Sequence, residues 1–289
     1  MSRLFEQNRI AIVWDFDKTL IPRYMQVPLF ERYDIAEQGF WDEVGAGSKH
    51  IESHGQKVNH ETFYLNVLLR HVRDGRMGGL DNATLRRLGA ELEFFPGVAD
   101  FFERSKAWVA GNPAYQAFDI KLEHYIVSTG LTEMIKGSPI APHIDGVWGC
   151  EFLEVPDAGG RPVISEVIYA IDNTTKTRAL FEINKGVNKH PEAVSVNASM
   201  AEDERRVPFA NMIYVADGPS DIPAFSVARK GGGRTYAVYN PDSPRSFEQG
   251  LKLHIGKIAD TIVHGKQEIL RETTRGIPQH FVEPKRAVP

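Results

Sequence analysis

The sequence Ile10-Ala-Ile-Val-Trp14-Asp15-Phe-Asp17-Lys-Thr19-Leu20 sets the expected architecture of this chain. Five apolar residues, β-branched or aromatic for the most part, predict a strand that is buried on both faces of a parallel sheet. Two carboxylates, Asp15 and Asp17, follow the strand directly. Ligands of open α/β sheets bind beyond the carboxyl ends of the strands, so these acids stand where chemistry is usually done. A motif this short also fits a solvated turn with a helix cap, and the downstream sequence has to decide.

Composition limits the class of protein. The chain has 289 residues, of which 42% are hydrophobic and 25% charged, an ordinary globular composition for one large domain or two moderate ones. A net charge of −4 without a basic run argues against nucleic acid or an anionic membrane as partner. Cys150 is the single cysteine, which excludes an internal disulfide. The first residues lack the apolar core of a signal peptide, and no stretch reaches the roughly 20 apolar residues of a membrane span. We therefore expect a cytoplasmic protein.

Residues 21–93 are expected to form a helical insertion. Apolar residues recur with helical spacing over 27–33, 62–72 and 81–90, with Asp81 as a candidate N-cap. The glycine-rich segments 45–49 and 73–79 are predicted as loops. About 70 residues far exceed the usual strand-to-helix connection of about 2–6 residues. We interpret 21–93 as a cap domain over the site, and 1–20 with 94–289 as the catalytic core.

The second predicted strand also ends in polar residues. The Pro-Gly turn at 96–97 opens a helix over 98–109, and the strand 121–127 then leads to Ser128-Thr129-Gly130 and a short helix over 131–136. Hydroxyls and backbone N–H groups at a helix N-terminus can hold a phosphate. An N-cap followed by a turn glycine explains the same residues.

Between residues 144 and 210 the pattern changes twice. Residues 144–171 alternate apolar and polar side chains around the turn 157–160, which predicts paired strands. A helix then starts near residue 174 with Lys176 in its first turn, where the helix dipole disfavours a cation, so this lysine is expected to have a partner or a function. Lys185 and Lys189, at or beyond the end of this helix, are expected to be solvated. Arg205 and Arg206, which lie before the next strand, are expected to be solvated or interfacial and not substrate-binding. Residues 187–210 are predicted to be irregular.

A third strand, 211–216, delivers carboxylates at its end. Asp217 and Asp221 are four residues apart across a Gly-Pro turn, so both can face one centre. A glycine loop at 231–233, a strand over 234–239, an amphipathic helix over 246–264 and an extended tail from 276 complete the prediction.

Strand ends that supply Asp-x-Asp-x-Thr, Ser-Thr, Lys and Asp-Gly-x-x-Asp in this order resemble the haloacid dehalogenase-like hydrolase superfamily. The resemblance covers residues 9–20 and 94–245, and the helical insertion makes the chain most similar to phosphoserine phosphatases and their relatives. It implies an α/β fold, with a Rossmann-like core whose parallel sheet is flanked by helices, and a helical cap inserted after the first strand. It also implies a Mg²⁺-dependent phosphatase that acts on a small phosphorylated metabolite.

Residue roles follow from the resemblance by position. Asp15 is the expected nucleophile, Asp17 the general acid and base, and Lys176 the charge-balancing cation, while Ser128, with Thr129 and Gly130, is expected to bind phosphate. The expected metal ligands are Asp15, Asp17 (through a backbone carbonyl nearby), Asp217 and Asp221. A carboxylate that attacks phosphorus splits hydrolysis into two displacements through an aspartyl phosphate. The presence of Asp17 argues against dehalogenation.

Two departures bear on the substrate. Phosphoserine phosphatases carry a glutamate where this chain has Tyr24, beside Arg23, and the fourth motif has Ala216 and Ser220 where glycine and asparagine are usual. With Arg23, Tyr24 and Ser220 contacting the substrate, we expect phosphoserine to be a poor substrate. An anionic or aromatic phosphate ester without an amino group is expected to be better.

Two other functions remain open at this point. The chain could transfer the phosphoryl group to an acceptor other than water, or it could be a non-catalytic sensor of a phosphorylated ligand. A sensor is expected to have lost Asp15 or Asp17, and both are present. Three of the histidines of the insertion stand at irregular spacing, and we expect them to be exposed or to line the substrate site and not to form a metal cluster: His50, His54 and His60.

Overall fold

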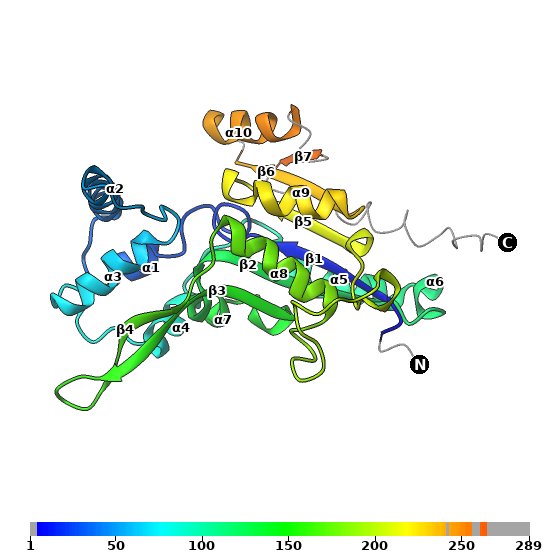
Figure 1. Cartoon of the computed structure of the whole chain (residues 1–289), viewed down its shortest axis with the longest axis horizontal. Helices are drawn as coiled ribbons and strands as arrows, with labels where there is room; N and C mark the ends of the chain where they lie inside the picture. Colours follow the sequence, from blue (N-terminus) through cyan, green and yellow to red (C-terminus); the bar gives the residue numbers. More distant parts are fainter. Residues whose placement is uncertain (1–4, 241–242, 256–260, 265–289) are drawn as a thin grey trace.

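The computed structural model describes residues 5–240, 243–255 and 261–264. Within them the fold is built on a seven-stranded sheet in the order β4-β3-β2-β1-β5-β6-β7 (Figure 1). All neighbouring strands are parallel except the antiparallel pair β3 and β4. The strands are β1 (Arg9–Trp14), β2 (Lys121–Leu131), β3 (Gly146–Pro156), β4 (Pro162–Tyr169), β5 (Met212–Ala216), β6 (Arg234–Tyr239) and β7 (Thr261–His264).

The first strand is buried on both faces, as its apolar sequence predicted. Residues 10–14 are each at most 2% exposed, and their side chains alternate between two hydrophobic cores. Trp14 pairs in register with Ile126 of β2 and Val215 of β5. The residues that follow these three strands therefore emerge at one edge of the sheet.

Helices cover both faces of the sheet. The core on one side includes apolar residues of α5 (Val98–Gly111), and the core on the other includes those of α8 (Asn173–Lys185) and α9 (Ile222–Lys230). The other helices after residue 94 are α6 (Pro113–Gln116), α7 (Thr132–Gly137) and α10 (Pro244–Ile255), with short 3₁₀ turns η1 (Ala141–His143), η2 (Glu202–Glu204), η3 (Phe209–Asn211) and η4 (Pro219–Asp221). This arrangement confirms the predicted α/β core.

The predicted helical insertion lies between β1 and α5. It comprises α1 (Val27–Arg32), α2 (Glu37–Ser53), α3 (Phe63–Arg73) and α4 (Asn82–Gly89), and Asp81 caps α4 by accepting a 2.6 Å hydrogen bond from Thr84 N. The last of these helices is tightly joined to the core. A Cβ atom at Gly89 would lie 2.0 Å from the carbonyl oxygen of Met134 in α7, so only glycine permits this approach.

The prediction of a loop at residues 45–49 was wrong, because these residues lie inside α2. Gly47 brings α2 close to α3: a Cβ atom there would stand 3.0 Å from Cε1 of Phe63. Packing between the two helices thus outweighs the low helix propensity of glycine. The second glycine-rich segment does form a loop, since α3 ends at Arg73 and Gly75 and Gly79 adopt positive φ.

The C-terminal part of the prediction was also wrong in detail. The helix expected over 246–264 is α10, which ends at Ile255, and residues 261–264 form β7 alongside β6. The Thr-Ile-Val sequence at residues 261–263 consists of β-branched residues, which favour a strand. The tail predicted from residue 276 lies outside the described residues.

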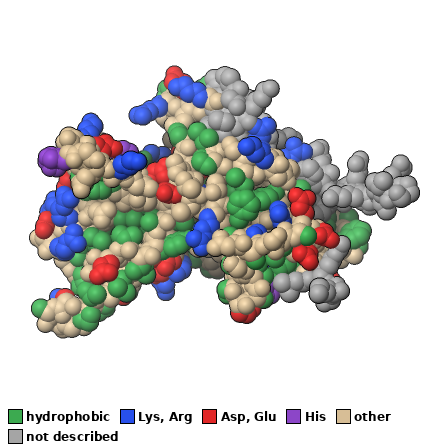
Figure 2. Space-filling view, in the orientation of Figure 1, with side chains coloured by type: hydrophobic (Ala, Val, Ile, Leu, Met, Phe, Trp, Pro, Cys, Tyr) green, Lys and Arg blue, Asp and Glu red, His purple; other side chains and the backbone are tan. Residues whose placement is uncertain are grey.

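The predicted pair of strands is the hairpin of β3 and β4. Asp157 stabilises its turn by accepting hydrogen bonds from the backbone N–H groups of Gly159 and Arg161. Hydrophobic side chains remain exposed on this hairpin at the edge of the sheet (Figure 2): Leu153, Val155, Ile168 and Tyr169. None of the helices among the described residues combines the length and apolarity that crossing a membrane requires.

Candidate functional site

Three carboxylates and one lysine meet at the carboxyl ends of β1 and β5. One oxygen from each of Asp15, Asp217 and Asp221 lies within 4.8 Å of the other two. Asp15 follows β1, Asp217 follows β5, and η4 turns the chain so that Asp221 points back to the same centre. The sequence prediction that Asp217 and Asp221 face one centre is confirmed.

Lys176 supplies the cation of this group. Its Nζ donates hydrogen bonds to Oδ1 of Asp15 at 2.8 Å and to Oδ1 of Asp221 at 2.7 Å, and the side chain is 1% exposed. Burial alone would lower the pKa of this amine, but the two carboxylates raise it above its ordinary value. The lysine at the positive end of a helix thus has two partners, as its unfavourable position predicted.

The carboxylate of Asp221 accepts hydrogen bonds from several neighbouring side chains. Its Oδ1 also accepts a 2.6 Å hydrogen bond from the hydroxyl of Tyr214, and its Oδ2 accepts one from Oγ of Ser220 at 3.0 Å. These contacts suit an anchor for Lys176 better than a direct metal ligand.

The two acids of the first motif occupy different environments. Asp15 accepts a 3.2 Å hydrogen bond from Oγ1 of Thr19, and burial raises its pKa to about 6 even though Lys176 acts in the opposite direction. Asp17 accepts a 2.8 Å hydrogen bond from the backbone N–H of Met25. Burial, and then the charge of Asp15, raise the pKa of Asp17 to about 7. A carboxyl with such a pKa can give and take a proton near neutral pH.

The donor set fits a hard divalent cation. Burial and the negative charge of Asp15 raise the pKa of Asp217 well above its ordinary value, and its carboxylate accepts no hydrogen bond from the residues that the structure describes. Mg²⁺ takes oxygen ligands, commonly one or two carboxylates. Asp15 and Asp217 meet that requirement. The carboxylate of Asp17 is not part of the group of three, which leaves its backbone carbonyl as its contribution to a metal.

The Ser128-Thr129-Gly130 segment forms the end of β2. Oγ of Ser128 accepts a 3.0 Å hydrogen bond from the N–H of Gly130, and the Ser128 side chain is buried. A Cβ atom at Gly130 would lie 2.2 Å from Cε of Met25, so the segment packs closely against the loop after β1. Thr129 lines the cavity described next.

A cavity of about 620 Å³ separates the carboxylates from the helical insertion. Asp15, Asp17 and Asp217 lie along it, together with Lys18 and Ser220. The insertion supplies an aromatic wall, and the segment around α10 supplies a polar one. Cavity residues that the sequence did not indicate include Gln26, Trp41, Glu61, Tyr64, Asn240, Arg245 and Gln249.

The structure separates the two neighbours that were expected to contact substrate. Tyr24 lines the large cavity. Arg23 does not line it, but forms an ion pair with Glu37 of α2 and, together with Tyr24, lines a second cavity of about 150 Å³. We therefore leave Arg23 out of the candidate site, because its charge already has a partner.

Three of the four histidines of the insertion are candidates for a metal cluster, and they are placed as follows. His60 lines the large cavity, and its Nε2 lies 2.9 Å from Oε1 of Glu52. The rings of His50 and His54 are 4.6 Å apart at the end of α2. The group of three aspartates is the only set within the described ranges whose acidic, histidine or cysteine ligand atoms converge.

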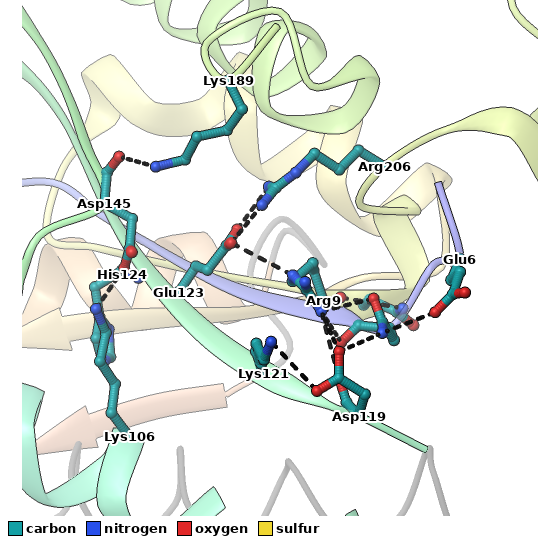
Figure 3. Close-up of polar contacts among 12 residues, drawn as sticks. Glu6, Arg9, Lys106, Asp119, Lys121, Glu123, His124, Asp145, Lys189 and Arg206 are labelled. Atoms are coloured by element: carbon teal, nitrogen blue, oxygen red, sulfur yellow. Dashed lines mark hydrogen bonds and ion pairs between the residues drawn. The ribbon is translucent and has the colours of Figure 1, made fainter. Parts of the chain in front are cut away.

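The far end of the sheet holds a separate polar cluster (Figure 3). Arg206 donates to both oxygens of Glu123, including a 2.7 Å bond to Oε2, and Tyr125 donates to Oε2 as well. This places Arg206 away from the site, as expected, in a largely buried ion pair within the chain and not in solvent. Lys189, predicted to be solvated, donates to the backbone carbonyl of Asp145. Lys185 likewise donates to the carbonyls of residues 196 and 198.

Comparisons with known proteins agree with this fold. No family model matches the chain. An uncharacterized protein of Borreliella burgdorferi is 35% identical over 268 residues, which cover 88% of this chain and 91% of that protein. A phospho-aspartyl intermediate analogue of phosphoserine phosphatase shares the fold with a TM-score of 0.53 and 15% identity, over 92% of this chain and 98% of that one. A haloacid dehalogenase family hydrolase of Salmonella enterica serovar Typhi has a TM-score of 0.51 and 14% identity, over 91% and 69%.

Proposed function

We propose that this chain, which belongs to one family with the Borreliella burgdorferi protein and has the haloacid dehalogenase-like fold, is a Mg²⁺-dependent phosphatase. Its substrate would be a small phosphorylated molecule, and its intermediate an aspartyl phosphate at Asp15. The observation that carries the proposal is the position of Asp15, which a buried lysine fixes beside Asp17, an acid whose pKa is about 7. The similar phosphoserine phosphatase structure, an analogue of a phospho-aspartyl intermediate, supports the same chemistry.

The first step is attack by Asp15 on phosphorus. Lys176 and Thr19 hold the two oxygens of this carboxylate, so its orientation is fixed before substrate binds. A bond forms between a carboxylate oxygen and phosphorus while the ester P–O bond breaks. Asp17, protonated, gives its proton to the departing alkoxide, which leaves as an alcohol.

The second step reverses the role of Asp17. Now ionised, it takes a proton from a water molecule that attacks the aspartyl phosphate, and phosphate leaves as Asp15 is restored. A pKa near 7 suits both halves of this cycle.

Positive charge is essential, since phosphoryl transfer places negative charge on oxygens that approach carboxylates. Lys176 provides one buried cation that contacts Asp15 directly. Asp15, Asp217 and the backbone carbonyl of Asp17 would hold Mg²⁺, which when bound neutralises charge on the phosphoryl oxygens.

We assign residues 21–93 to a cap that covers the site, with 1–20 and 94–289 as the core. The position of the insertion supports this assignment, because Trp41 and Tyr64 line the same cavity as the carboxylates. The Ser128-Thr129-Gly130 segment, at the end of β2, is the proposed phosphate-binding side of the cavity.

The test is phosphate release from a panel of phosphate monoesters in the presence of Mg²⁺. We expect turnover by the wild type and its loss in Asp15→Asn, whose amide cannot form the acyl phosphate. Asp100→Asn, on the exposed side of α5, is the matched control. Borohydride reduction during turnover should convert Asp15 to homoserine, which mass spectrometry detects. Absence of release from every ester, or activity in Asp15→Asn, would overturn the proposal.

A further inference from the structure

The hydroxyl of Tyr64 links the helical insertion to the segment at the end of β2. Tyr64 lies on α3 and is 4% exposed, and its hydroxyl donates a 2.8 Å hydrogen bond to the backbone carbonyl of Thr129. The thiol of Cys150 on β3 donates to the same carbonyl at 3.3 Å. Burial raises the pKa of Tyr64 well above its ordinary value, so the hydroxyl keeps its proton and acts as the donor at neutral pH.

The carbonyl that accepts this bond belongs to a peptide group that is held at both ends. The carbonyl of Thr129 and the N–H of Gly130 are parts of one planar peptide, so they point in opposite directions. The N–H donates to Oγ of Ser128 at 3.0 Å, while the carbonyl accepts from Tyr64. Rotation of this peptide would break both bonds. The two contacts together therefore fix the backbone at Thr129, which lines the cavity.

The segment that carries Tyr64 is itself anchored to the core. Nδ2 of Asn59 donates to Oδ2 of Asp172 at 2.9 Å, and Oε2 of Glu61 accepts a 2.7 Å hydrogen bond from the backbone N–H of Asn173. Both partners lie at the N-terminus of α8, the helix that carries the buried lysine of the site. Residues 59–64 thus contact two elements of the core that supply residues of the candidate site.

Pairing of the buried carbonyl does not by itself explain the bond from Tyr64. The carbonyl of Thr129 already has a donor in Cys150, which belongs to the core. What Tyr64 adds is a direct link between the insertion and the end of β2, and both Tyr64 and Thr129 line the cavity. Groups that are fixed before a ligand arrives bind it more tightly, because less ordering remains to be done on binding.

We propose that Tyr64 is a positioning residue for phosphate binding: its hydroxyl holds the peptide between Thr129 and Gly130 in the orientation that binds the phosphoryl group. Affinity for phosphate then depends on the docking of residues 59–64 on the core. This inference rests on the proposed function, because that function assigns residues 128–130 to the phosphate. Since the contact acts on the phosphate-binding segment, its loss affects inorganic phosphate and every ester alike.

The test uses Tyr64→Phe, which removes the hydroxyl and keeps the ring. Thermal unfolding titrated with inorganic phosphate in the presence of Mg²⁺ gives the Kd of phosphate without turnover. We expect this Kd to rise about threefold to tenfold, the effect of one hydrogen bond. The KM values of phenyl phosphate and ribose 5-phosphate should rise by the same factor while kcat changes by less than about twofold, as loss of uniform binding does.

Tyr33→Phe is the matched control, because Tyr33 is a partly buried tyrosine of the same insertion that does not line the cavity. It should leave the Kd of phosphate and both KM values unchanged. Asn59→Ala is a second variant, on an exposed side chain, that removes the contact with Asp172. It should also raise the Kd of phosphate, and it decides the inference if Tyr64→Phe does not fold.

The outcomes separate this inference from the proposed function. A lower Tm of Tyr64→Phe with an unchanged Kd of phosphate would show a bond that only stabilises the fold, and would overturn the inference. A KM that rises for phenyl phosphate alone would do the same, because it would show a contact with the organic part of the ester. Phosphate binding without turnover of any ester would reject the phosphatase proposal, and the Kd values would still judge the inference. A wild type that neither binds phosphate nor turns over an ester would reject both.

Discussion

Nζ of Lys176 lies 2.8 Å from Oδ1 of Asp15, although 161 residues separate the two in the chain. The same ammonium contacts Asp221 at 2.7 Å, so one buried cation serves two carboxylates. Asp217, within 4.8 Å of both acids, has no cation of its own among the described residues. The three carboxylates therefore carry two more negative charges than Lys176 can neutralise, and this excess is what a divalent cation would balance.

Replacing Lys176 by methionine should both inactivate and destabilise the protein. The change leaves Asp15 and Asp221 buried without a counter-charge, which costs about 3–5 kcal/mol for a buried pair that loses one partner. Urea unfolding measures the loss. Arg178→Met, on the same helix in an exposed pair with Glu182, should cost less than about 1 kcal/mol. Adding Asp221→Asn to Lys176→Met should restore part of the stability, and a further loss instead would show that charge is not the cause.

Asp217→Asn should weaken the binding of Mg²⁺ and at the same time stabilise the metal-free protein. In chelator the variant should be more stable than the wild type, because it removes a partly buried carboxylate whose pKa is raised by desolvation and by the charge of Asp15. The same variant should need much more Mg²⁺ for activity, and Mg²⁺ should raise its Tm less than it raises that of the wild type. Thermal unfolding with and without Mg²⁺ provides both readouts. Equal stabilisation of the two proteins by Mg²⁺ would contradict the assignment.

The metal-free protein should lose stability between pH 5 and pH 8 through Asp17. Its folded pKa of about 7 lies above the unfolded value of about 3.9. Such a group contributes stability at low pH that disappears as pH rises through its folded pKa. The expected difference between wild type and Asp17→Asn over this interval is about 2–3 kcal/mol.

That comparison needs the variant as reference. Burial lowers the pKa of His124 to about 3, so below about pH 6.5 its unfolded form takes up a proton that the folded form does not. His124 therefore makes the folded protein more stable as pH rises, whereas Asp17 makes it less stable. Because His124 is present in both proteins, its effect cancels in the difference, and parallel profiles would show that Asp17 does not titrate in this interval.

The residues at strand ends could be predicted from sequence, because each directly follows a buried apolar run. Asp15, Asp17 and Asp217 each stand one to three residues beyond a strand, and parallel register brings these positions together. Lys176 was indicated by its unfavourable place in a helix.

The cavity wall could not be predicted in the same way. Trp41 and Tyr64 have the helical spacing of ordinary core residues, and only the packing of α2 against α3 turns them toward the site. The unpaired oxygen of Gln26 depends on which donors lie nearby in space, which spacing does not encode. Gly47 inside α2 and the partner of Arg206 were missed for the same reason, since both depend on contacts between distant segments.

Arg206→Met should destabilise the protein without a direct effect on the site. Burial raises the pKa of Glu123, but the hydrogen bonds from Arg206 and Tyr125 outweigh it and hold that pKa below its ordinary value. Removing the guanidinium should cost about 2–4 kcal/mol at pH 7. The contribution of the pair is present above the ordinary pKa of glutamate and is lost as pH falls through the folded value, so the effect should shrink toward pH 3. Arg161→Met, in an exposed pair, is the control.

The site should discriminate against substrates that carry an amino group. The ammonium of phosphoserine needs an anionic partner, and burying it unpaired would cost several kcal/mol. Tyr24 offers a ring whose face already lies against the ammonium of Lys18, so a second cation would be repelled there. Phosphoserine should therefore have a lower kcat/KM than the best ester without an amino group.

Tyr24→Glu should shift that preference toward phosphoserine. The new carboxylate can pair with the substrate ammonium, although Lys18 would compete for it, so we expect a gain of about tenfold in the ratio of kcat/KM values and not more. Tyr24→Gln has the same length without the charge and should leave phosphoserine disfavoured. Arg23→Ala should change kcat and KM by less than twofold, because Arg23 pairs with Glu37 outside the large cavity. If wild-type phosphoserine turnover exceeds that of every other ester, the cavity must hold the ammonium with another acid, and Glu61, which lines it, is the first to replace by glutamine.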